Sequence, residues 1–198
     1  MAKTKDLESR LERLERQLRL YQTISRLLVK QSPLAESVET VMRLLAEFAG
    51  SDSCLLYLVS AGELILCASA GPNPQAVGEV RLRLDEGLTG WVARERRLLA
   101  ISREAYNDPR FKFFRDLPED TFEAFLSGPI IIRNRVVGVI NIQHRQPHSH
   151  SGDEMELLHT VGEQLGALVA LACLDSADFD RAAYADLVLS SRLAVGSR

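Results

Sequence analysis

Two runs of β-branched residues in the second half of the chain show the clearest pattern of apolar positions. They cover residues 130–132 and 136–142 and flank Arg133-Asn134-Arg135. Asn readily adopts the left-handed backbone conformation of a tight reversal, so this pattern predicts a β-hairpin. The second run is apolar at almost every position, which is typical of a strand that is covered on both faces. Within it, Gly138 predicts a bulge or a close approach of another backbone.

Four further strands are predicted upstream, each a short apolar or alternating run bounded by turn residues. They cover residues 54–59, 63–68, 80–84 and 98–101. Ser60-Ala61-Gly62 joins the first two as a second hairpin. Between the last two, Gly87 marks a turn before a short helix through residues 91–96.

The first 31 residues predict a helix with a narrow apolar stripe. Its apolar side chains recur at alternating steps of four and three, which is the repeat of a two-stranded coiled coil. The positions are Leu7, Leu11, Leu14, Leu18 and Tyr21. Acid-first charge pairs four residues apart accompany the stripe and fit a solvated helix surface. We therefore expect self-association through this stripe; the alternative is that it packs on the chain's own domain.

Two more helices bracket the predicted strands. One begins with Ser32 as N-cap and Pro33 at the first helical position, and it ends at Gly50. The other begins with a capping box formed by Ser151 and Glu154. Its apolar positions make a second narrow seam of Leu158, Val161, Leu165, Leu168 and Ala172. Seams at both ends of one domain predict a parallel helical bundle in a dimer.

Residues 103–127 interrupt the regular pattern with an aromatic-rich stretch, in which one or two helical turns are predicted around residues 119–126. So long a connection inside a domain is typical of a lid over a small-molecule pocket. The candidate ligand-binding residues are Tyr106, Asp108, Phe111, Phe122, Phe125 and Ser127. The alternative is that the aromatic side chains only anchor the segment on the sheet.

Composition narrows the classes of function. The net charge of −3 gives no electrostatic reason for nucleic-acid binding. The N-terminus is charged and we find no apolar run of about 18 residues, so we expect no membrane segment and a cytoplasmic location. Cys54, Cys67 and Cys173 fit no metal-ligand spacing, and we expect buried, inert thiols.

Histidines and carboxylates offer little catalytic chemistry. His144, His148, His150 and His159 fall within a short stretch. We expect a solvated loop there rather than a metal site, because no cysteine is near and no rigid frame is evident. The chain lacks the nucleophile elbow, the P-loop, the dinucleotide glycine fingerprint and the H-E-x-x-H motif, so we expect no enzyme activity.

Several motifs together resemble the GAF domain of bacterial signalling proteins. They are EGLTGWVARERRLLAIS, NDPRF, FLSGPIIIRNRVVGVINIQ and the helix from Asp153 to Ala172. The resemblance covers residues 32–174, between a dimerisation helix at 1–31 and a helical tail at 175–198. It implies an α+β fold: a twisted antiparallel sheet with the terminal helices on one face, and a ligand pocket under loops and short helices on the other. It also implies dimerisation through the terminal helices.

The resemblance implies a sensory role, and departures from family motifs narrow it. Cyclic-nucleotide-binding members carry an Asn-Lys to Asp-Glu motif, whereas here Asn107 precedes Asp108. Bilin-binding members and the free methionine sulfoxide reductases need cysteines near the pocket, and none lies between Cys67 and Cys173. We therefore expect a non-enzymatic homodimeric sensor that binds an unidentified small molecule under residues 103–127 and signals to a protein partner. No cofactor can be named. One alternative is a dimerisation scaffold without ligand; another is an enzyme whose polar groups converge beneath the loop.

Overall fold

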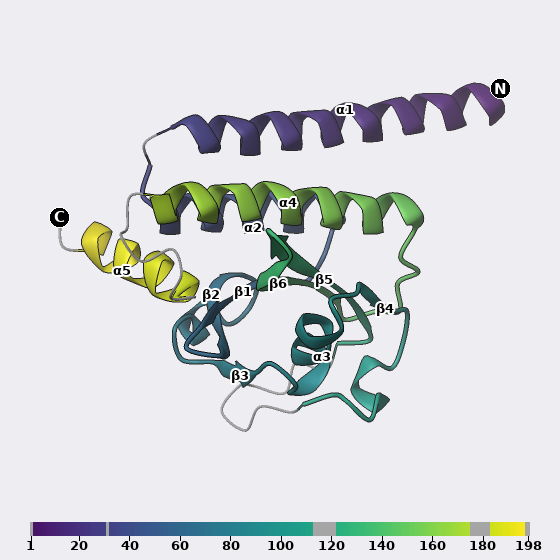
Figure 1. Ribbon diagram of the computed structural model, residues 1–198. Coiled ribbons are helices and arrows are strands. Elements are labelled where there is room, and N and C mark those ends of the chain that lie inside the picture. The colour runs from purple at the N-terminus through teal and green to yellow at the C-terminus, as the bar shows by residue number, and fades with distance from the viewer. Residues whose placement is uncertain (1, 31, 113–121, 175–182, 197–198) are drawn as a thin grey trace.

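The strands form one antiparallel sheet. The computed structural model describes residues 2–30, 32–112, 122–174 and 183–196, and in these the sheet has six strands in the order β3-β2-β1-β6-β5-β4 (Figure 1). Their bounds are β1 Ser53–Ser60, β2 Glu63–Ala70, β3 Arg81–Arg83, β4 Leu99–Ile101, β5 Ala124–Ile132 and β6 Arg135–His144. The predicted α+β class and both predicted hairpins are confirmed.

Helices cover both faces of the sheet. They are α1 Ala2–Val29, α2 Leu34–Ala49, α3 Gly87–Glu95, α4 Gly152–Leu174 and α5 Tyr184–Gly196, with short 3₁₀ turns η1 Pro74–Ala76 and η2 Ala105–Asn107. Figure 1 shows α2 and α4 on one face, α3 on the other, and α1 lying along α4. Helices α2 and α4 therefore form the layer of long helices on one face, and α1 packs on the outer side of that layer. The short helix and loops form the opposite layer.

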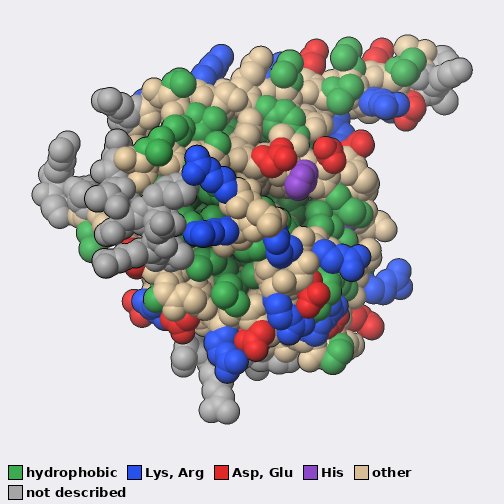
Figure 2. All heavy atoms as spheres, viewed as in Figure 1, with side chains coloured by type: hydrophobic (Ala, Val, Ile, Leu, Met, Phe, Trp, Pro, Cys, Tyr) green, Lys and Arg blue, Asp and Glu red, His purple; other side chains and the backbone are tan. Residues whose placement is uncertain are grey.

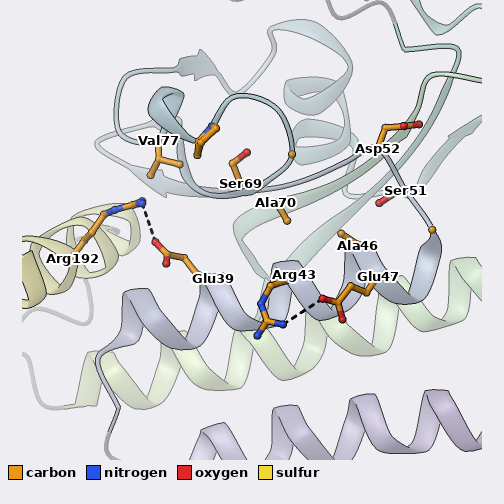
Figure 3. Close-up of a pocket in the computed structure, with 13 residues that line it drawn as sticks. Glu39, Arg43, Ala46, Glu47, Ser51, Asp52, Ser69, Ala70, Val77 and Arg192 are labelled. Atoms are coloured by element: carbon orange, nitrogen blue, oxygen red, sulfur yellow. Dashed lines mark hydrogen bonds and ion pairs between the residues drawn. The ribbon is translucent and has the colours of Figure 1, made fainter.

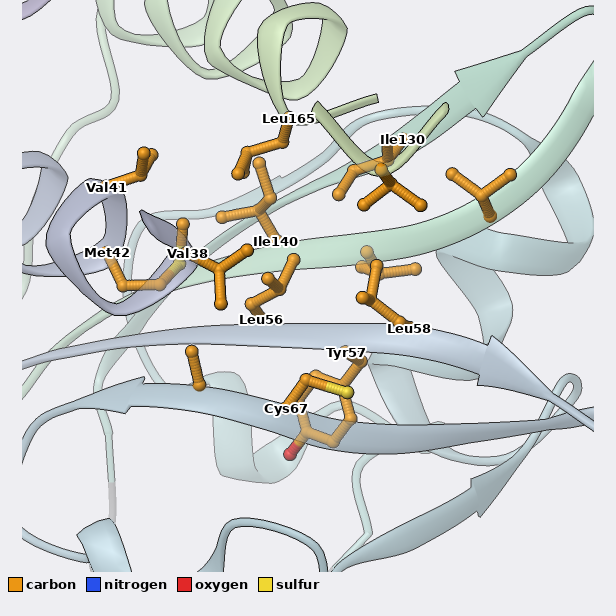
Figure 4. Packing of buried hydrophobic residues seen from close by; sticks show 14 of the residues in the cluster. Val38, Val41, Met42, Leu56, Tyr57, Leu58, Cys67, Ile130, Ile140 and Leu165 are labelled. Carbon is orange, nitrogen blue, oxygen red and sulfur yellow. The ribbon is translucent and has the colours of Figure 1, made fainter. Parts of the chain in front are cut away.

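The main core lies between the sheet and the layer of long helices. Side chains alternate across each strand, so Leu56 and Leu58 of β1, Ile130 of β5 and Ile140 of β6 point toward the helices and are buried (Figure 4). They meet Val38, Val41 and Met42 of α2 and Leu165 of α4. Each fully buried side chain of this size stabilises the fold by about 1.5–3 kcal/mol. Tyr57 and Cys67 lie on the other side of the sheet.

The central hairpin, β5–β6, forms as the sequence indicates. Arg133 and Asn134 have positive φ angles of 44° and 66° in its turn. The β5–β6 register shifts between the pairs Ile130–Gly138 and Ile131–Val136, so Gly138 lies at a bulge as well as at a close backbone approach. A Cβ atom at Gly138 would run into the carbonyl oxygen of Tyr57 on β1 and into the side chain of Leu58.

Three predicted boundaries are wrong. Residues 124–126 belong to β5 instead of a helical turn, because pairing with β4 and β6 overrides local preference; residues 119–121 lie outside the described chain. The short helix begins at Gly87 rather than near residue 91. Helix α2 begins at Leu34, since Pro33 is extended (φ −52°, ψ 137°) and takes the N-cap position that was predicted for Ser32.

The ends of α2 and α4 follow the predicted capping chemistry. Gly50 closes α2 in the left-handed conformation at φ 59°. At the start of α4, the Ser151 amide donates to Glu154 Oε2 at 2.7 Å, and the Glu154 amide donates to Ser151 Oγ at 3.2 Å. Both partners of the capping box are therefore in place.

The second predicted helical seam does not face another molecule. Leu158, Val161, Leu165 and Leu168 are buried within the chain, with Leu158 seated over Gly128 of β5. The same spacing of three and four that suits a coiled coil also suits a helix that packs on a sheet. The prediction that this seam joins a bundle in a dimer is therefore wrong.

The stripe on α1 behaves differently. Its second half packs on the domain through Leu20 and Ile24, which are buried. The leucines of the first half are 54–59% exposed, namely Leu7, Leu11, Leu14 and Leu18. Figure 2 shows apolar side chains standing among charged ones on the helix end that projects at the upper right, where Figure 1 places α1. The predicted coiled-coil surface is therefore exposed on the first half of α1.

Helix α4 has a composition that bears on membranes. Among the described residues, it is the one helix long and apolar enough to cross a bilayer, with a mean hydropathy of 1.5, whereas we expected no such stretch. Half of this window is buried inside the domain. Packing against the sheet accounts for its apolar side chains, so the composition is weak support for a membrane span.

We expect Gly138→Ala to lower the free energy of unfolding by about 3 kcal/mol, because the new methyl group meets the fixed Tyr57 carbonyl in the middle of the sheet. Urea unfolding measures the change. Gly152→Ala is the matched control, since nothing lies within 4 Å of its added Cβ, and it should change stability by no more than about 1 kcal/mol. Equal effects of the two substitutions would contradict this account of Gly138.

Candidate functional site

The sheet face under α3 carries polar side chains in otherwise apolar strands. Residues of β5 and β6 that point away from the long helices include Phe125 and Ser127, which pair with Gln143 and Asn141. All four are at most 9% exposed. Buried polar side chains in a central strand require hydrogen-bond partners, because burying them unpaired is costly.

Three of the buried polar groups form a chain of hydrogen bonds. Ser127 Oγ donates to Asn141 Oδ1 at 2.7 Å, and Asn141 Nδ2 donates to Thr89 Oγ1 at 2.8 Å. Thr89 belongs to α3, so the chain ties this helix to the two central strands. Gln143 Oε1, next on the same face of β6, is buried without a hydrogen-bond partner among the described residues.

A small apolar cluster lies beside this polar chain. Leu88 of α3, Ala105 of η2 and Phe125 of β5 are buried together, and Phe111 packs against them. The cluster anchors the start of the segment 103–127 on the sheet. In this cluster Phe111 and Phe125 hold the segment on the sheet, which is the alternative to ligand binding that the sequence left open.

A hollow of about 530 Å³ opens outside that cluster, between α3 and the segment after η2. Its walls combine an indole with charged groups of both signs, and the lining residues are Asp85, Glu86, Gly87, Trp91, Arg94, Pro109, Arg110, Phe111 and Lys112. The Arg110 guanidinium lies 4.5 Å from the centre of the Trp91 ring. Such walls suit a small charged molecule better than an apolar one.

Ion pairs hold the charged walls in place. Arg110 Nε and Nη2 donate to the two oxygens of Asp108 at 2.8 and 2.7 Å. This bidentate pairing lowers the pKa of Asp108 and raises that of Arg110. Lys112 Nζ donates to Glu86 Oε1 at 2.6 Å, and this hydrogen bond lowers the pKa of Glu86. Both carboxylates are therefore held ionised at neutral pH.

The six predicted ligand-binding residues do not form one cavity wall in the described chain. Phe111 lines the hollow. Asp108 does not line it but forms an ion pair with Arg110, which does. Phe122, Phe125 and Ser127 are buried in packing. Tyr106 points its hydroxyl at Glu123 Oε1, to which it donates at 3.0 Å.

Sequence reasoning missed several residues of this region. Thr89, Trp91 and Arg110 were not singled out, although the first two lie in the EGLTGWV motif and Arg110 lies in the NDPRF motif. Asn141 and Gln143 had a usable signal, because they are the polar positions at every second residue of the apolar run VVGVINIQ. That alternation indicates a strand with one distinctive face.

A second hollow, of about 680 Å³, lies on the other side of the domain (Figure 3). It is bounded by α2, the start of β1, the end of β2 and α5, and ion pairs Arg43–Glu47 and Glu39–Arg192 lie along it at 3.4 and 3.1 Å. Ser51 and Ser69 place buried hydroxyls there without a partner among the described residues. No residue of the predicted site lines it.

The histidines depart from expectation. His144 is buried, and its ring stacks on that of His148 with centroids 4.1 Å apart. Burial and the neighbouring imidazoles lower the pKa of His144 and bring that of His150 to about 4. The expectation of a solvated loop is therefore wrong for His144, whereas His148 and His150 are half-buried. His159 is exposed on α4, as expected of a surface residue.

The three cysteines are buried, as expected. Burial raises the pKa of each thiol, that of Cys67 to about 12. A thiol that stays protonated is a poor nucleophile.

We expect Arg110→Ala to raise the pKa of Asp108 toward 3.8, because the guanidinium that favours the carboxylate is removed. Carbon-13 NMR titration of the aspartate carboxyl groups measures this pKa. In the parent protein the folded pKa is depressed, so the stabilising contribution of Asp108 is present above pH 3.8 and is lost as the pH falls through the folded pKa. Arg43→Ala, which removes an exposed ion pair elsewhere, should leave the Asp108 titration unchanged. An ordinary Asp108 pKa in the parent protein would contradict the bidentate pairing.

Known proteins with a similar sequence or fold include parts of phosphotransferase proteins. The chain is 30% identical over 122 residues to the Escherichia coli "Phosphoenolpyruvate-dependent phosphotransferase system" protein, a match that covers 61% of this chain and 16% of that protein. It thus matches about a sixth of the length of this curated relative. The solved GAF domain of a phosphoenolpyruvate-protein phosphotransferase (ptsP) from Coxiella burnetii is 27% identical, with a TM-score of 0.75, and the match covers 82% of this chain and 98% of that one.

Two further structures bear on the comparison. The GAF domain of the Acinetobacter phosphoenolpyruvate-protein phosphotransferase is 26% identical, with a TM-score of 0.74, over 83% of this chain and 98% of that one. The free methionine-R-sulfoxide reductase of Neisseria meningitidis is 16% identical, with a TM-score of 0.63, over 75% and 84%, a likeness that shows the fold alone. The sequence profile of the GAF domain matches residues 33–169. The chain therefore belongs to the GAF domain family.

Proposed function

We propose that this GAF domain is a non-enzymatic regulatory module of a cytoplasmic phosphotransferase-type signalling protein. In this proposal a small charged molecule binds in the hollow between α3 and the segment after η2. Its binding changes how the terminal helices pack, and a protein partner or a further part of the signalling protein reads that change. The regulatory role is supported by the likeness to GAF domains of phosphoenolpyruvate-protein phosphotransferases.

The hollow lined by Trp91, Arg110 and Lys112 is the observation that carries the proposal. It lies under the segment where a ligand was expected, and its charged groups are already paired and oriented. A bound anion would meet guanidinium and ammonium groups that need little reorganisation, which lowers the entropic cost of binding.

A continuous set of contacts leads from this hollow to the long helices. Thr89 of α3 is bonded to Asn141 of β6, and β6 runs directly into the connection before α4. At the start of α4, Ser151 Oγ accepts a hydrogen bond from Arg13 of α1 at 3.3 Å. A shift of α3 therefore has a physical route to the α1–α4 pair.

A homodimer completes the proposal. The exposed leucine stripe on α1 supplies a surface with coiled-coil spacing, and the buried second half of the helix fixes its direction relative to the domain. Two such helices side by side would bury both stripes and join two sensory domains.

A dimerisation scaffold without ligand is the second candidate. It is favoured by Phe122, Phe125 and Ser127, which are buried in packing beneath the segment rather than lining a cavity. Under this alternative the stripe on α1 still associates, but the hollow stays solvated. Ligand binding therefore distinguishes the two functions.

We expect native mass spectrometry of the protein, purified without denaturation, to show mass in excess of the chain that is lost after denaturation. Arg110→Ala should weaken retention of this ligand about tenfold or more, since a charged hydrogen-bond partner is lost. Arg43→Ala, in the second hollow, is the matched control and should retain it. No bound mass in any sample would favour the scaffold, and turnover of a candidate ligand would contradict the non-enzymatic role.

We expect Leu11→Glu combined with Leu14→Glu to weaken self-association of the full chain, because two charges replace leucines that are 58% and 54% exposed on the stripe. Sedimentation velocity over a concentration series measures this. Leu84→Glu changes an exposed leucine outside α1 and should leave association intact. A parent protein that sediments as a monomer at all concentrations would refute the coiled-coil surface.

A further inference from the structure

The connection between β6 and α4 gathers three imidazoles. His144 is the last residue of β6, and His148 and His150 follow before the α4 capping box. One potential ligand atom from each ring lies within 4.8 Å of the other two. The ring centroids are 4.1, 5.0 and 5.8 Å apart. Imidazole nitrogens grouped in this way are the ligands that zinc and related transition metals prefer.

In His148 and His150, one ring nitrogen is engaged by a neighbouring group, which leaves the other nitrogen of each ring as the candidate metal ligand. The ring of His150 forms a hydrogen bond with the backbone of Ile101, while its Nε2 is buried without a partner among the described residues. The His148 Nε2 lies 3.1 Å from Glu154 Oε1, so it donates to this carboxylate and leaves Nδ1 as the electron-pair donor. An outer carboxylate or carbonyl that fixes the other ring nitrogen is typical of metal-binding histidines.

The surrounding backbone holds the cluster in place. The His148 amide donates to the Ser102 carbonyl at 3.0 Å, and His144 is fixed by β-pairing with Ala124. Glu154 is itself held by Ser151 in the capping box. These contacts form the rigid frame that was not evident from the sequence. They bring histidines from the end of β6 and from the following loop together beside the start of α4.

We propose that His144, His148 and His150 bind a divalent transition metal ion of the zinc class, with Glu154 as the positioning residue that orients His148. Tetrahedral zinc with nitrogen ligands at about 2.1 Å requires ligand atoms about 3.4 Å apart. In the structure the three ligand atoms lie within 4.8 Å of one another, and the His144 and His148 rings are stacked at an interplanar angle of 14°. Binding an ion therefore requires these two rings to turn out of the stack, so that each directs a nitrogen at it. The fourth position is left to water or to an added ligand.

Metal binding at this point would fasten the β6–α4 connection. The ion would link the end of the central strand to residues directly before α4, while Ser151 contacts Arg13 of α1. The site lies apart from the α3 hollow and shares no lining residue with it. The inference therefore stands independently of the proposed small-molecule ligand.

The test is titration of the full, untagged, metal-free chain with Zn²⁺ by calorimetry, and with Co²⁺ by visible absorption. We expect one Zn²⁺ per chain and the intense d–d bands of a nitrogen-ligated tetrahedral Co²⁺ site. His148→Ala and His150→Ala should each weaken binding at least tenfold, and Glu154→Gln about tenfold through loss of orientation. His159→Ala is the matched control, because it removes the remaining, exposed histidine of the chain.

Three outcomes would overturn the proposal. They are the absence of stoichiometric Zn²⁺ binding by the parent chain, equal loss in His159→Ala, and undiminished binding when His144, His148 and His150 are all replaced. Circular dichroism of each variant shows whether it is folded. If a variant unfolds, the Co²⁺ spectrum of the parent chain decides alone: octahedral, weak bands refute the site, and tetrahedral bands support it.

Discussion

The burial of β6 on both faces is the constraint on which the rest of this domain depends. This strand pairs with β1 and β5, and its alternate residues enter different layers. Ile140 and Ile142 join the core under α2 and α4, whereas Asn141 and Gln143 face the layer of α3. The backbones of β6 and β1 approach so closely at Gly138 that a side chain is excluded. One strand therefore determines both the stability of the core and the chemistry of the opposite face.

Polar groups on a strand buried in this way must be satisfied locally. Asn141 meets this demand by accepting from Ser127 and donating to Thr89, so the hydrogen bonds also fix α3 against the sheet. An unsatisfied buried amide or hydroxyl costs about 1–3 kcal/mol, which makes this arrangement selective for one position of the helix. The position of the α3 wall of the hollow follows from this constraint, and residues 109–112, Phe111 among them, form the facing wall.

The sequence allowed prediction of those features that local chemistry determines. Asn134 specified the hairpin turn, Gly50 the end of α2, and Ser151 with Glu154 the start of α4. Features determined by distant contacts were missed. Residues 124–126 form a strand because β4 and β6 flank them, and the leucine seam of α4 meets a sheet because its spacing fits either partner. The candidate site was predicted at the level of the segment, but the residues that line the hollow follow from how α3 docks.

The histidines show why spacing alone could not reveal their arrangement. His144 belongs to a strand and His148 and His150 to a loop, so no helical or strand period relates them. Their convergence depends on the chain turning back over β4, where Ser102 accepts from the His148 amide and Ile101 bonds the His150 ring. The same turn sets the direction in which α4 leaves the sheet. An ion that drew these rings together would therefore act on the covalent connection between β6 and α4, beside the direct packing of Ile140 under α4, whether or not a small molecule occupies the α3 hollow.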